Sequence, residues 1–414
     1  MIDADSGYVE PPRYRATPKY VLMLGVMSAL GAVSTDMYLP NLPDVAGDLG
    51  TSETMAQITM TSMMIGGAIG QITVGPLSDR FGRRAPALLG TALHVLTAIG
   101  CAFAPAIAPL IGLRLMMGIF NASAGVTSMA IIRDRFIGRE ASALMSRLML
   151  VIGVAPLLAP TIGSLIGDWA GWRGVFFALA VYGVVLWLVI WLKLPETLPR
   201  ERRVMNLPWK TFGVLLRDRY FVGLAVLPSL LSAVLMSYVV GSPFVLKEGY
   251  GLTSLQFSLV FACNGMGLVA GAQLNAALVK HFTSAQILRV SLPVTGILAL
   301  VLLLVGGTGY GGLPGLLLSL FALVFTINIS PPNAAALALA RHGETAGTAA
   351  SFIGFLQGVV PATVAPLVSI FGGSTANMAA VMASAAFAAI IVLASVTPIY
   401  RSGGVAELDS ATLQ

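Results

Sequence analysis

The sequence predicts an all-α membrane protein whose twelve transmembrane helices form two pseudo-symmetric bundles of six. Of the 414 residues, 57% are hydrophobic and only 10% are charged, whereas soluble domains carry roughly 25% charged residues. Twelve apolar segments are long enough to cross a bilayer, and one long polar segment divides them into two sets of six. Such a chain can cover its surface only in lipid, because there the outer faces of the helices can be apolar too.

The predicted spans follow from the length that a membrane requires, about 20 predominantly apolar residues for a helix. The first six spans are expected at 20–40, 53–75, 86–104, 108–131, 145–167 and 174–194. The second six are expected at 221–246, 254–278, 286–305, 313–335, 346–370 and 376–399. The chain is therefore expected to consist of a tail (1–18), a first bundle (19–194), a linker (195–219), a second bundle (220–400) and a second tail (401–414).

The basic residues predict the orientation, because Lys and Arg in short loops stay on the cytoplasmic side of a membrane. If the N-terminus is cytoplasmic, all but three of the 24 basic residues fall on that side. The exceptions are Arg173 and Lys247, which lie outside, and Arg114, which lies within a span. Both termini are therefore expected in the cytoplasm. Since the net charge of +6 arises from these loop clusters, it does not indicate a nucleic-acid partner.

The residues do not suggest an enzyme or a metalloprotein. No nucleophile paired with a base, no phosphate-cradling loop and no Cys/His cluster stands out in the sequence. Cys101 and Cys263 each lie in an apolar run, where free thiols that pack as small hydrophobes are expected. We therefore expect neither catalysis nor a cofactor.

Two charged residues within spans are functional candidates, since charge inside a membrane is costly. These are Asp36 in the first span and Arg114 in the fourth. Given the opposite directions of the two spans and a rise of 1.5 Å per residue, both lie roughly 10 Å below the outer surface. Equal depth permits an ion pair, which is either a static tie between helices or a protonatable site. Because burial disfavours a charged carboxyl and a guanidinium favours it, motion of Arg114 could load and release a proton.

Several motifs resemble those of one family. The loop GPLSDRFGRR at 75–84 is similar to the signature between helices two and three of the major facilitator superfamily. The fifth span resembles the motif of its drug–proton antiporters through Gly153, Pro156, Pro160 and Gly163. Segments 34–43, 194–199, 241–246 and 346–357 are similar to its bicyclomycin/chloramphenicol-resistance branch. These segments run from the first span to the eleventh.

The resemblance implies roles for these residues. In this family, the equivalents of Asp36 and Arg114 are implicated in proton coupling, and the loop aspartate, here Asp79, is thought to latch the halves in the outward-facing state.

We hypothesise a cytoplasmic gate that combines the start of the eleventh span, including Glu344, with loop residues Gly75, Asp79, Arg80, Gly82, Arg83 and Arg84. The N-terminus of the eleventh helix would attract Asp79, and Glu344 could pair with Arg83. The motif of the fifth span either permits close packing or, as its association with antiport favours, bends that helix between the halves.

Substrate contacts are expected from polar and aromatic residues buried in the spans. The candidates are Tyr38, Asn121, Tyr238, Asn264, Asn328 and Gln357. Each of the polar ones is equally a candidate for a hydrogen bond between helices. Some members of the family carry a second acidic residue in the first span, which this chain lacks, and Met117 stands where glutamine is common. A neutral or zwitterionic substrate is therefore expected.

The predicted function is a proton-coupled multidrug efflux antiporter of the bacterial inner membrane. It would work as a monomer by alternating access, and the proton gradient would be its energy source. Its expected partners are the lipid bilayer and a small-molecule substrate. Two alternatives stay open. One is export of an endogenous metabolite, such as an amino acid or a peptide, and the other is a receptor or scaffold that kept the fold without transport.

Overall fold

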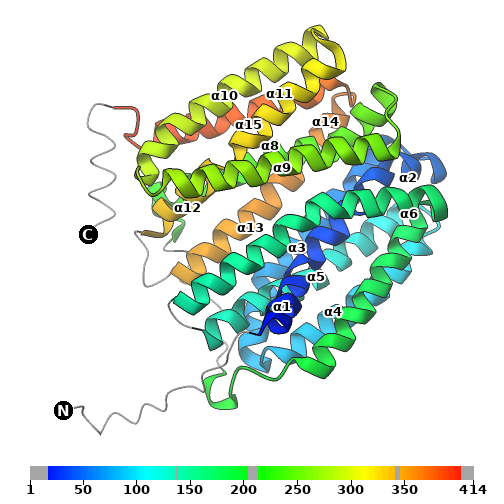
Figure 1. The fold of residues 1–414 in the computed structure, drawn as a ribbon, viewed down its shortest axis with the longest axis vertical. Coiled ribbons are helices and arrows are strands. Elements are labelled where there is room, and N and C mark those ends of the chain that lie inside the picture. Colours follow the sequence, from blue (N-terminus) through cyan, green and yellow to red (C-terminus); the bar gives the residue numbers. More distant parts are fainter. Residues whose placement is uncertain (1–16, 137–138, 204–212, 214, 341–345, 402–414) are drawn as a thin grey trace.

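The computed structural model describes residues 17–136, 139–203, 213, 215–340 and 346–401 (Figure 1). All regular elements among them are helical. The first half contains α1 (Pro18–Asp36), the 3₁₀ turn η1 (Leu39–Asn41), α2 (Leu42–Asp48), α3 (Glu53–Phe81), α4 (Arg84–Ala102), α5 (Ile107–Arg135) and α6 (Arg139–Lys193), followed by the 3₁₀ turn η2 (Arg200–Arg202). The second half contains α8 (Arg219–Pro243), the π-helical turn η3 (Phe244–Gly249), α9 (Ser254–Leu278), α10 (Ser284–Thr308), α11 (Gly312–Ile327), α12 (Ser330–Ala340), α13 (Ala346–Val364), α14 (Leu367–Ile370) and α15 (Thr375–Val396).

These helices confirm the predicted twelve-span fold. Within the described residues, eleven helical ranges are long and apolar enough to cross a membrane. One of them belongs to α6, whose backbone leaves the helical conformation at Gly171 (φ 68°), so that α6 consists of two helices. A left-handed φ favours glycine, and this residue separates the fifth span from the sixth. Counted separately, the two parts of α6 complete the twelve.

Side-chain caps define the starts of several helices at the membrane surface. The Oγ atoms of Ser52 and Ser374 accept hydrogen bonds from the backbones of Met55 and Asn377, in the first turns of α3 and α15. Thr253 begins α9 with a reciprocal capping box to Gln256. Such caps satisfy backbone N–H groups that a helix leaves unpaired at its start. The spans therefore begin where the sequence changes from capping residues to apolar ones.

Glycines allow the helices of the first bundle to approach closely. A Cβ on Gly66 or Gly118 would collide with the backbone of the facing helix, because α3 and α5 touch there. A Cβ on Gly163 of α6 would likewise collide with the backbone of Met37. Small residues at such contacts are typical of membrane helices, whose association depends on close packing.

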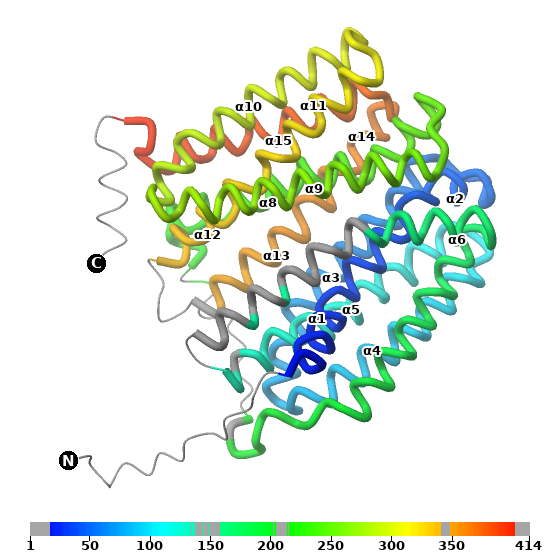
Figure 2. Tube along the Cα trace, viewed as in Figure 1, coloured from blue at the N-terminus to red at the C-terminus, as the bar shows by residue number. Residues whose placement is uncertain are grey.

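The chain forms two six-helix bundles, α1–α6 and α8–α15, which lie side by side (Figures 1 and 2). The bundles contact each other through α3 with α13 and through α6 with α9. Among the described residues, the hydrogen bonds between the bundles lie at the end of the molecule that carries α2 and η3. There Nζ of Lys247 donates to the carbonyl of Pro40 at 2.9 Å and pairs with Asp44 at 3.6 Å. The bundles are thus tied at one end.

Candidate transport site

Arg114 is the most deeply buried charged residue of the described chain, with none of its surface exposed. Its Nη1 donates to the carbonyl of Ser34 at 3.2 Å. Its other polar contacts are with methionine sulfur atoms. Sδ of Met117 lies 3.7 Å from Nη1, and Sδ of Met60 lies 3.3 Å from Nη2. Methionine sulfur is a weak acceptor, so the guanidinium has one strong acceptor and no acidic partner within the described residues.

Aromatic rings cover the faces of this guanidinium. Its Cζ lies 4.5 Å from the ring centroid of Tyr38 and 5.7 Å from that of Phe176. Cation–π contacts of this kind gain strength where water is excluded. The hydroxyl of Tyr38 is hydrogen-bonded to Thr59 at 3.0 Å. Tyr38, expected to line the substrate path, is fully buried beneath Arg114.

Asp36 does not pair with Arg114, so the predicted ion pair was wrong for this conformation. Asp36 ends α1, is buried, and forms no hydrogen bond or ion pair with any described residue. The reason is its direction. Residues two apart on a helix point roughly 200° apart, and Arg114 lies on the side of Ser34 and Tyr38. Asp36 therefore faces away from Arg114 in this conformation.

The loop after α3 forms a tight ionic cluster centred on Arg83. Its Nη1 donates to Oδ1 of Asp79 at 2.5 Å, and its Nε donates to Oδ2 of Asp134 at 2.7 Å. Burial lowers the pKa of Arg83, but the hydrogen bonds to Asp134 and Asp79 outweigh burial and raise this pKa overall. Asp134, near the end of α5, had not been singled out as a partner. The sequence feature that could have indicated Asp134 is its position as an acidic residue between two basic ones, Arg133 and Arg135.

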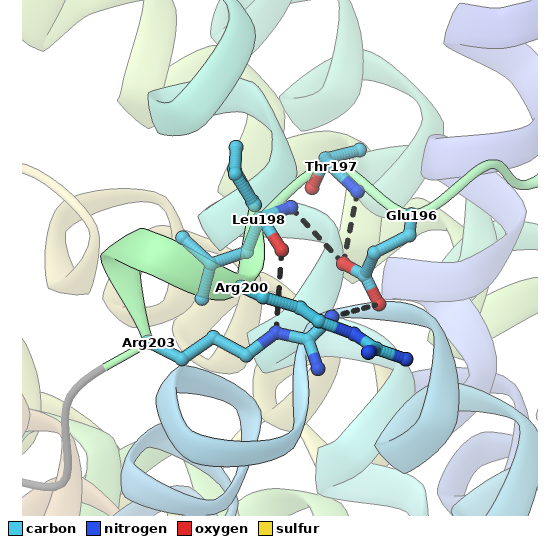
Figure 3. A pocket seen from close by; sticks show the side chains of 6 residues that line it. Glu196, Thr197, Leu198, Arg200 and Arg203 are labelled. Carbon is cyan, nitrogen blue, oxygen red and sulfur yellow. Dashed lines mark hydrogen bonds and ion pairs between the residues drawn. The ribbon is translucent and has the colours of Figure 1, made fainter.

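A second acidic residue holds the other side of this loop. Oε1 of Glu196 accepts from the backbone N–H of Arg83 at 2.8 Å, and Oε2 accepts from that of Arg84 at 3.3 Å. Burial raises the pKa of Glu196, but bonds from the backbones of Leu198, Arg83, Arg84 and Thr197 lower it overall. Glu196 also pairs with Arg203 at 3.7 Å (Figure 3).

Two of the loop glycines have different surroundings. Gly82 has a φ of 89°, and a Cβ there would collide with the carboxylate of Glu196. Only glycine fits this position without strain. Gly75 instead lies at a cavity of about 210 Å³, whose lining residues are Gly75, Ser78, Asp79, Arg83, Val126, Ala130 and Asp134. A second cavity, of about 370 Å³, is lined by residues 196–200 and Arg203 (Figure 3).

The other residues of the expected gate have separate surroundings. Arg80 lies over the ring of Phe81, with Cζ 5.2 Å from the centroid. Nη2 of Arg84 donates to the carbonyl of Trp191 at 2.5 Å. Glu344, the expected partner of Arg83, lies outside the described residues. In this conformation Arg83 is engaged by Asp79 and Asp134 instead.

Within the motif of the fifth span, Pro160 lies at the interface between the bundles. Pro160 is buried, and its carbonyl accepts from Oγ of Ser258 at 3.3 Å, while Oγ of Ser164 is 3.0 Å from the same hydroxyl. Gly163 packs on Met37. Gly153 and Pro156 lie in the part of α6 whose side chains are outside the description. The non-helical point of α6 is Gly171, beyond the motif.

The polar candidates of the second bundle form hydrogen bonds between helices. Nδ2 of Asn264 donates to the hydroxyl of Tyr238 at 2.8 Å, and the ring of Tyr238 stacks on Phe261 with centroids 5.7 Å apart. Nδ2 of Asn328 donates to the carbonyl of Leu268 at 3.4 Å. Of the other two candidates, Asn121 is buried in the first bundle and Gln357 is half-buried on α13. The structure thus joins Tyr238 with Asn264 and leaves the rest apart.

Comparisons with known proteins agree with this architecture. Residues 24–366 match the Major Facilitator Superfamily. The chain is 37% identical over 366 residues to the uncharacterized MFS-type transporter YdgK of Bacillus subtilis, covering 87% of this chain and 90% of the relative. It is 30% identical over 361 residues to a bicyclomycin resistance protein homolog of Haemophilus influenzae, covering 86% and 90%. It is 27% identical over 401 residues to a chloramphenicol resistance protein of Pseudomonas aeruginosa, covering 95% and 94%.

Solved structures share the fold at low sequence identity. A peptide transporter POT in complex with alafosfalin superposes with a TM-score of 0.75 at 18% identity, over 92% of this chain and 96% of that one. A D-xylose–proton symporter gives a TM-score of 0.71 at 17% identity, over 92% and 98%. Two six-helix bundles, the matched loop at 75–84 and these relatives together show that the chain belongs to the major facilitator superfamily, in the branch of the bicyclomycin and chloramphenicol resistance proteins.

Proposed function

We propose that this protein is a proton-coupled exporter that moves small neutral or zwitterionic compounds out of the cytoplasm by alternating access. The names of its relatives support drug-like cargo, since they include bicyclomycin and chloramphenicol resistance proteins. The expected location is the bacterial inner membrane, with both termini in the cytoplasm and a monomer as the working unit.

The observation that carries this proposal is the separation of Asp36 from Arg114. A buried carboxyl without a cationic partner favours its protonated form, and a nearby guanidinium favours ionisation. Among the described residues Asp36 has no hydrogen-bonding or ionic partner, and Arg114 is held away from it by the carbonyl of Ser34 and the ring of Tyr38. A rotation of the first span would bring the two together and release the proton. Proton binding and conformation are thereby coupled.

The ties between the bundles support alternating access. With cytoplasmic termini, Lys247, Pro40 and Asp44 would lie on the outer side, and their contacts support a conformation closed to the outside. The partners that Arg83 finds in Asp79 and Asp134 belong to the first bundle alone. The cytoplasmic gate would close when the start of the eleventh span docks on this cluster and exchanges partners with it.

The charge of the site favours a neutral or zwitterionic cargo. Asp36 is the one acidic residue that is buried among the described residues. When Asp36 carries the proton, no second carboxylate stands beside it to balance a cationic drug. The buried hydrogen-bonding pair of Tyr238 and Asn264 suits a polar uncharged group.

The test uses inside-out vesicles that hold a preset pH gradient. Chloramphenicol, bicyclomycin and a small panel of amino acids and dipeptides are added in turn. We expect a drug to dissipate the gradient through the native protein and not through Asp36→Asn. The matched control is Asp168→Asn, because Asp168 is exposed near the outer end of the fifth span.

Three outcomes would contradict parts of the proposal. A response to amino acids or dipeptides alone would replace drug export by metabolite export. Full drug transport by Asp36→Asn would remove Asp36 from proton coupling. Drug binding to purified protein without any gradient response in vesicles would favour a receptor.

A further inference from the structure

Two carboxyl groups, one from each bundle, contact each other at the end of the molecule that carries α2 and η3. Glu53 is the first residue of α3 in the first bundle, and Glu248 lies in η3 of the second. Their side chains are hydrogen-bonded to each other. Among the described residues, no ion pair links either of them to a lysine or an arginine. Since a carboxylate oxygen only accepts, this hydrogen bond requires a proton on one of the two groups.

A glycine of the second bundle makes room for Glu53 at this contact. Oε2 of Glu53 would lie 2.7 Å from a Cβ on Gly373, which precedes α15 and has a left-handed φ of 65°. Glycine suits both this backbone conformation and the narrow space. Glu53 is half-buried, whereas Glu248 is exposed. The carboxyl of Glu53 therefore meets two segments of the second bundle, and the solution has access to the pair through Glu248.

The other charged groups at this end have partners of their own. Nζ of Lys247 pairs with Asp44 at 3.6 Å across the bundles. Asp48 pairs with Arg173 inside the first bundle, so its titration does not act between the bundles. Protonation of Asp44 would weaken its tie to Lys247 and loosen the outer side. Protonation of the two glutamates would tighten it, so the two effects of acid have opposite signs.

The chemistry of the two glutamates couples proton binding to closure. Two carboxylates at hydrogen-bond distance repel each other, so ionisation of one opposes ionisation of the other. The bundles can meet at Glu53 and Glu248 while one proton is bound, and loss of that proton favours their separation.

We propose that Glu53 and Glu248 form a proton-binding site between the bundles, whose single shared proton holds the outer side closed. This inference rests on the alternating access proposed above and extends it. A proton that arrives from outside would favour closure of the outer side, which is the direction that export driven by proton entry requires.

Spin-label distances across the outer side of the full-length protein in lipid nanodiscs, without substrate, test this inference. Labels replace Gly47 on α2 and Tyr310 between α10 and α11, two exposed residues of different bundles, and serine replaces the exposed Cys263 (Figure 1). We expect a short distance at pH 5 and a growing long-distance population toward pH 8. The ratio of the two should change roughly tenfold if the carboxyl groups interact by about one pK unit. Identical distributions at both pH values would overturn the inference.

Amide substitutions identify the groups that bind the proton. Glu53→Gln and Glu248→Gln each remove one negative charge and keep a hydrogen bond, so we expect the short distance at both pH values. Glu201→Gln, at an exposed position of η2, is the matched control and should keep the native response to pH. A native response in both Glu53→Gln and Glu248→Gln would overturn the inference.

Asp36→Asn separates this site from the proposed proton coupling at Asp36. We expect Asp36→Asn to keep the native response of the distance to pH while it loses drug-driven proton flux in vesicles. If the response disappears in Asp36→Asn and persists in both glutamine variants, Asp36 is the sensor and the glutamate site is absent. If the distances respond as expected and no drug dissipates the gradient, the glutamate site stands and the proposed export fails.

Discussion

The guanidinium of Arg114 lies on the ring of Tyr38, with Cζ 4.5 Å from the ring centroid, and the hydroxyl of Tyr38 is tied to Thr59 on α3. The same turn of the first span thus provides the carbonyl of Ser34, the ring of Tyr38 and, on its other side, Asp36. Any rotation of this span that moves Asp36 toward Arg114 must first separate the guanidinium from the ring. In the proposed transport cycle, the cation–π contact is therefore part of the barrier between the two states.

Substitution of Tyr38 should distinguish the ring from its hydroxyl. Tyr38→Phe keeps the cation–π contact and leaves Thr59 bonded to the carbonyl of Ala56 at 2.5 Å, so we expect a loss of about 1 kcal/mol or less in stability. Tyr38→Leu removes the contact, and we expect a further loss of about 2 kcal/mol, because the site excludes water. Thermal unfolding in nanodiscs measures both. Equal loss in the two variants would show that the hydroxyl, and not the ring, matters.

Replacement of Arg114 should separate stability from transport. A buried charge without an acidic partner carries a desolvation penalty, and a hydrophobic replacement of similar volume is often neutral or stabilising by about 1–4 kcal/mol. We therefore expect Arg114→Met to unfold at an equal or higher temperature than the native protein while drug-driven proton flux is lost. Arg114→Lys, which keeps the charge and loses the planar fork, should be less stable than both. A lower unfolding temperature for Arg114→Met would mean that Arg114 is mainly structural.

The fold was predictable because span length and loop charge are set by the bilayer itself. Twelve spans follow from runs of about 20 apolar residues, and the turn at Gly171 falls between two of them. The placement of Asp36 and Arg114 within spans followed from the same count. The direction of each side chain did not, because it depends on how the first span is rotated against α3 and α5. That rotation is fixed by glycine contacts such as Gly163 on Met37, which only tertiary packing reveals.

The loop at 75–84 was recognised, but its partners were not. Asp134 and Glu196 are 51 and 113 residues from Arg83, so spacing along the chain gives no hint of contact. One signal was present. Acidic residues are unexpected among the basic ones that mark cytoplasmic loops, and both residues lie directly after a span. An isolated carboxylate at such a place indicates a specific partner.

Asp134 should matter more to the loop cluster than its position suggests. The side chain of Arg83 is only 8% exposed, so loss of a partner leaves a buried charge underpaired. We expect Asp134→Asn to lower stability by about 1–3 kcal/mol and to weaken transport. Asp79→Asn should lower transport more than stability, because Asp79 is the more exposed partner and the expected contact of the eleventh span. Unchanged transport in Asp79→Asn at normal expression would contradict the gate.

Glu196 should make stability depend on pH. Its pKa in the folded protein is lower than its ordinary value of 4.5, so the folded state favours the carboxylate. This contribution is fully present above the unfolded pKa and is lost as the pH falls through the folded pKa. We expect the native unfolding temperature to drop more than that of Glu196→Gln between pH 7 and pH 4. Parallel curves for the two proteins would exclude Glu196 as a source of this dependence.

Lys247 should hold the outer side closed. Its side chain is 14% exposed, and it bridges from η3 of the second bundle to the carbonyl of Pro40 and to Asp44 in the first. Lys247→Met keeps the length of the side chain and removes both bonds, so we expect the population to shift toward the outward-open state. Spin labels on α2 and at the start of α15, in a background where the exposed Cys263 is replaced by serine, report this shift as a longer distance.

Lys280→Met, at an exposed position after α9, is the matched control and should leave the distance unchanged. An unchanged distribution in Lys247→Met would mean that contacts such as Ser258 with Ser164 are sufficient for closure.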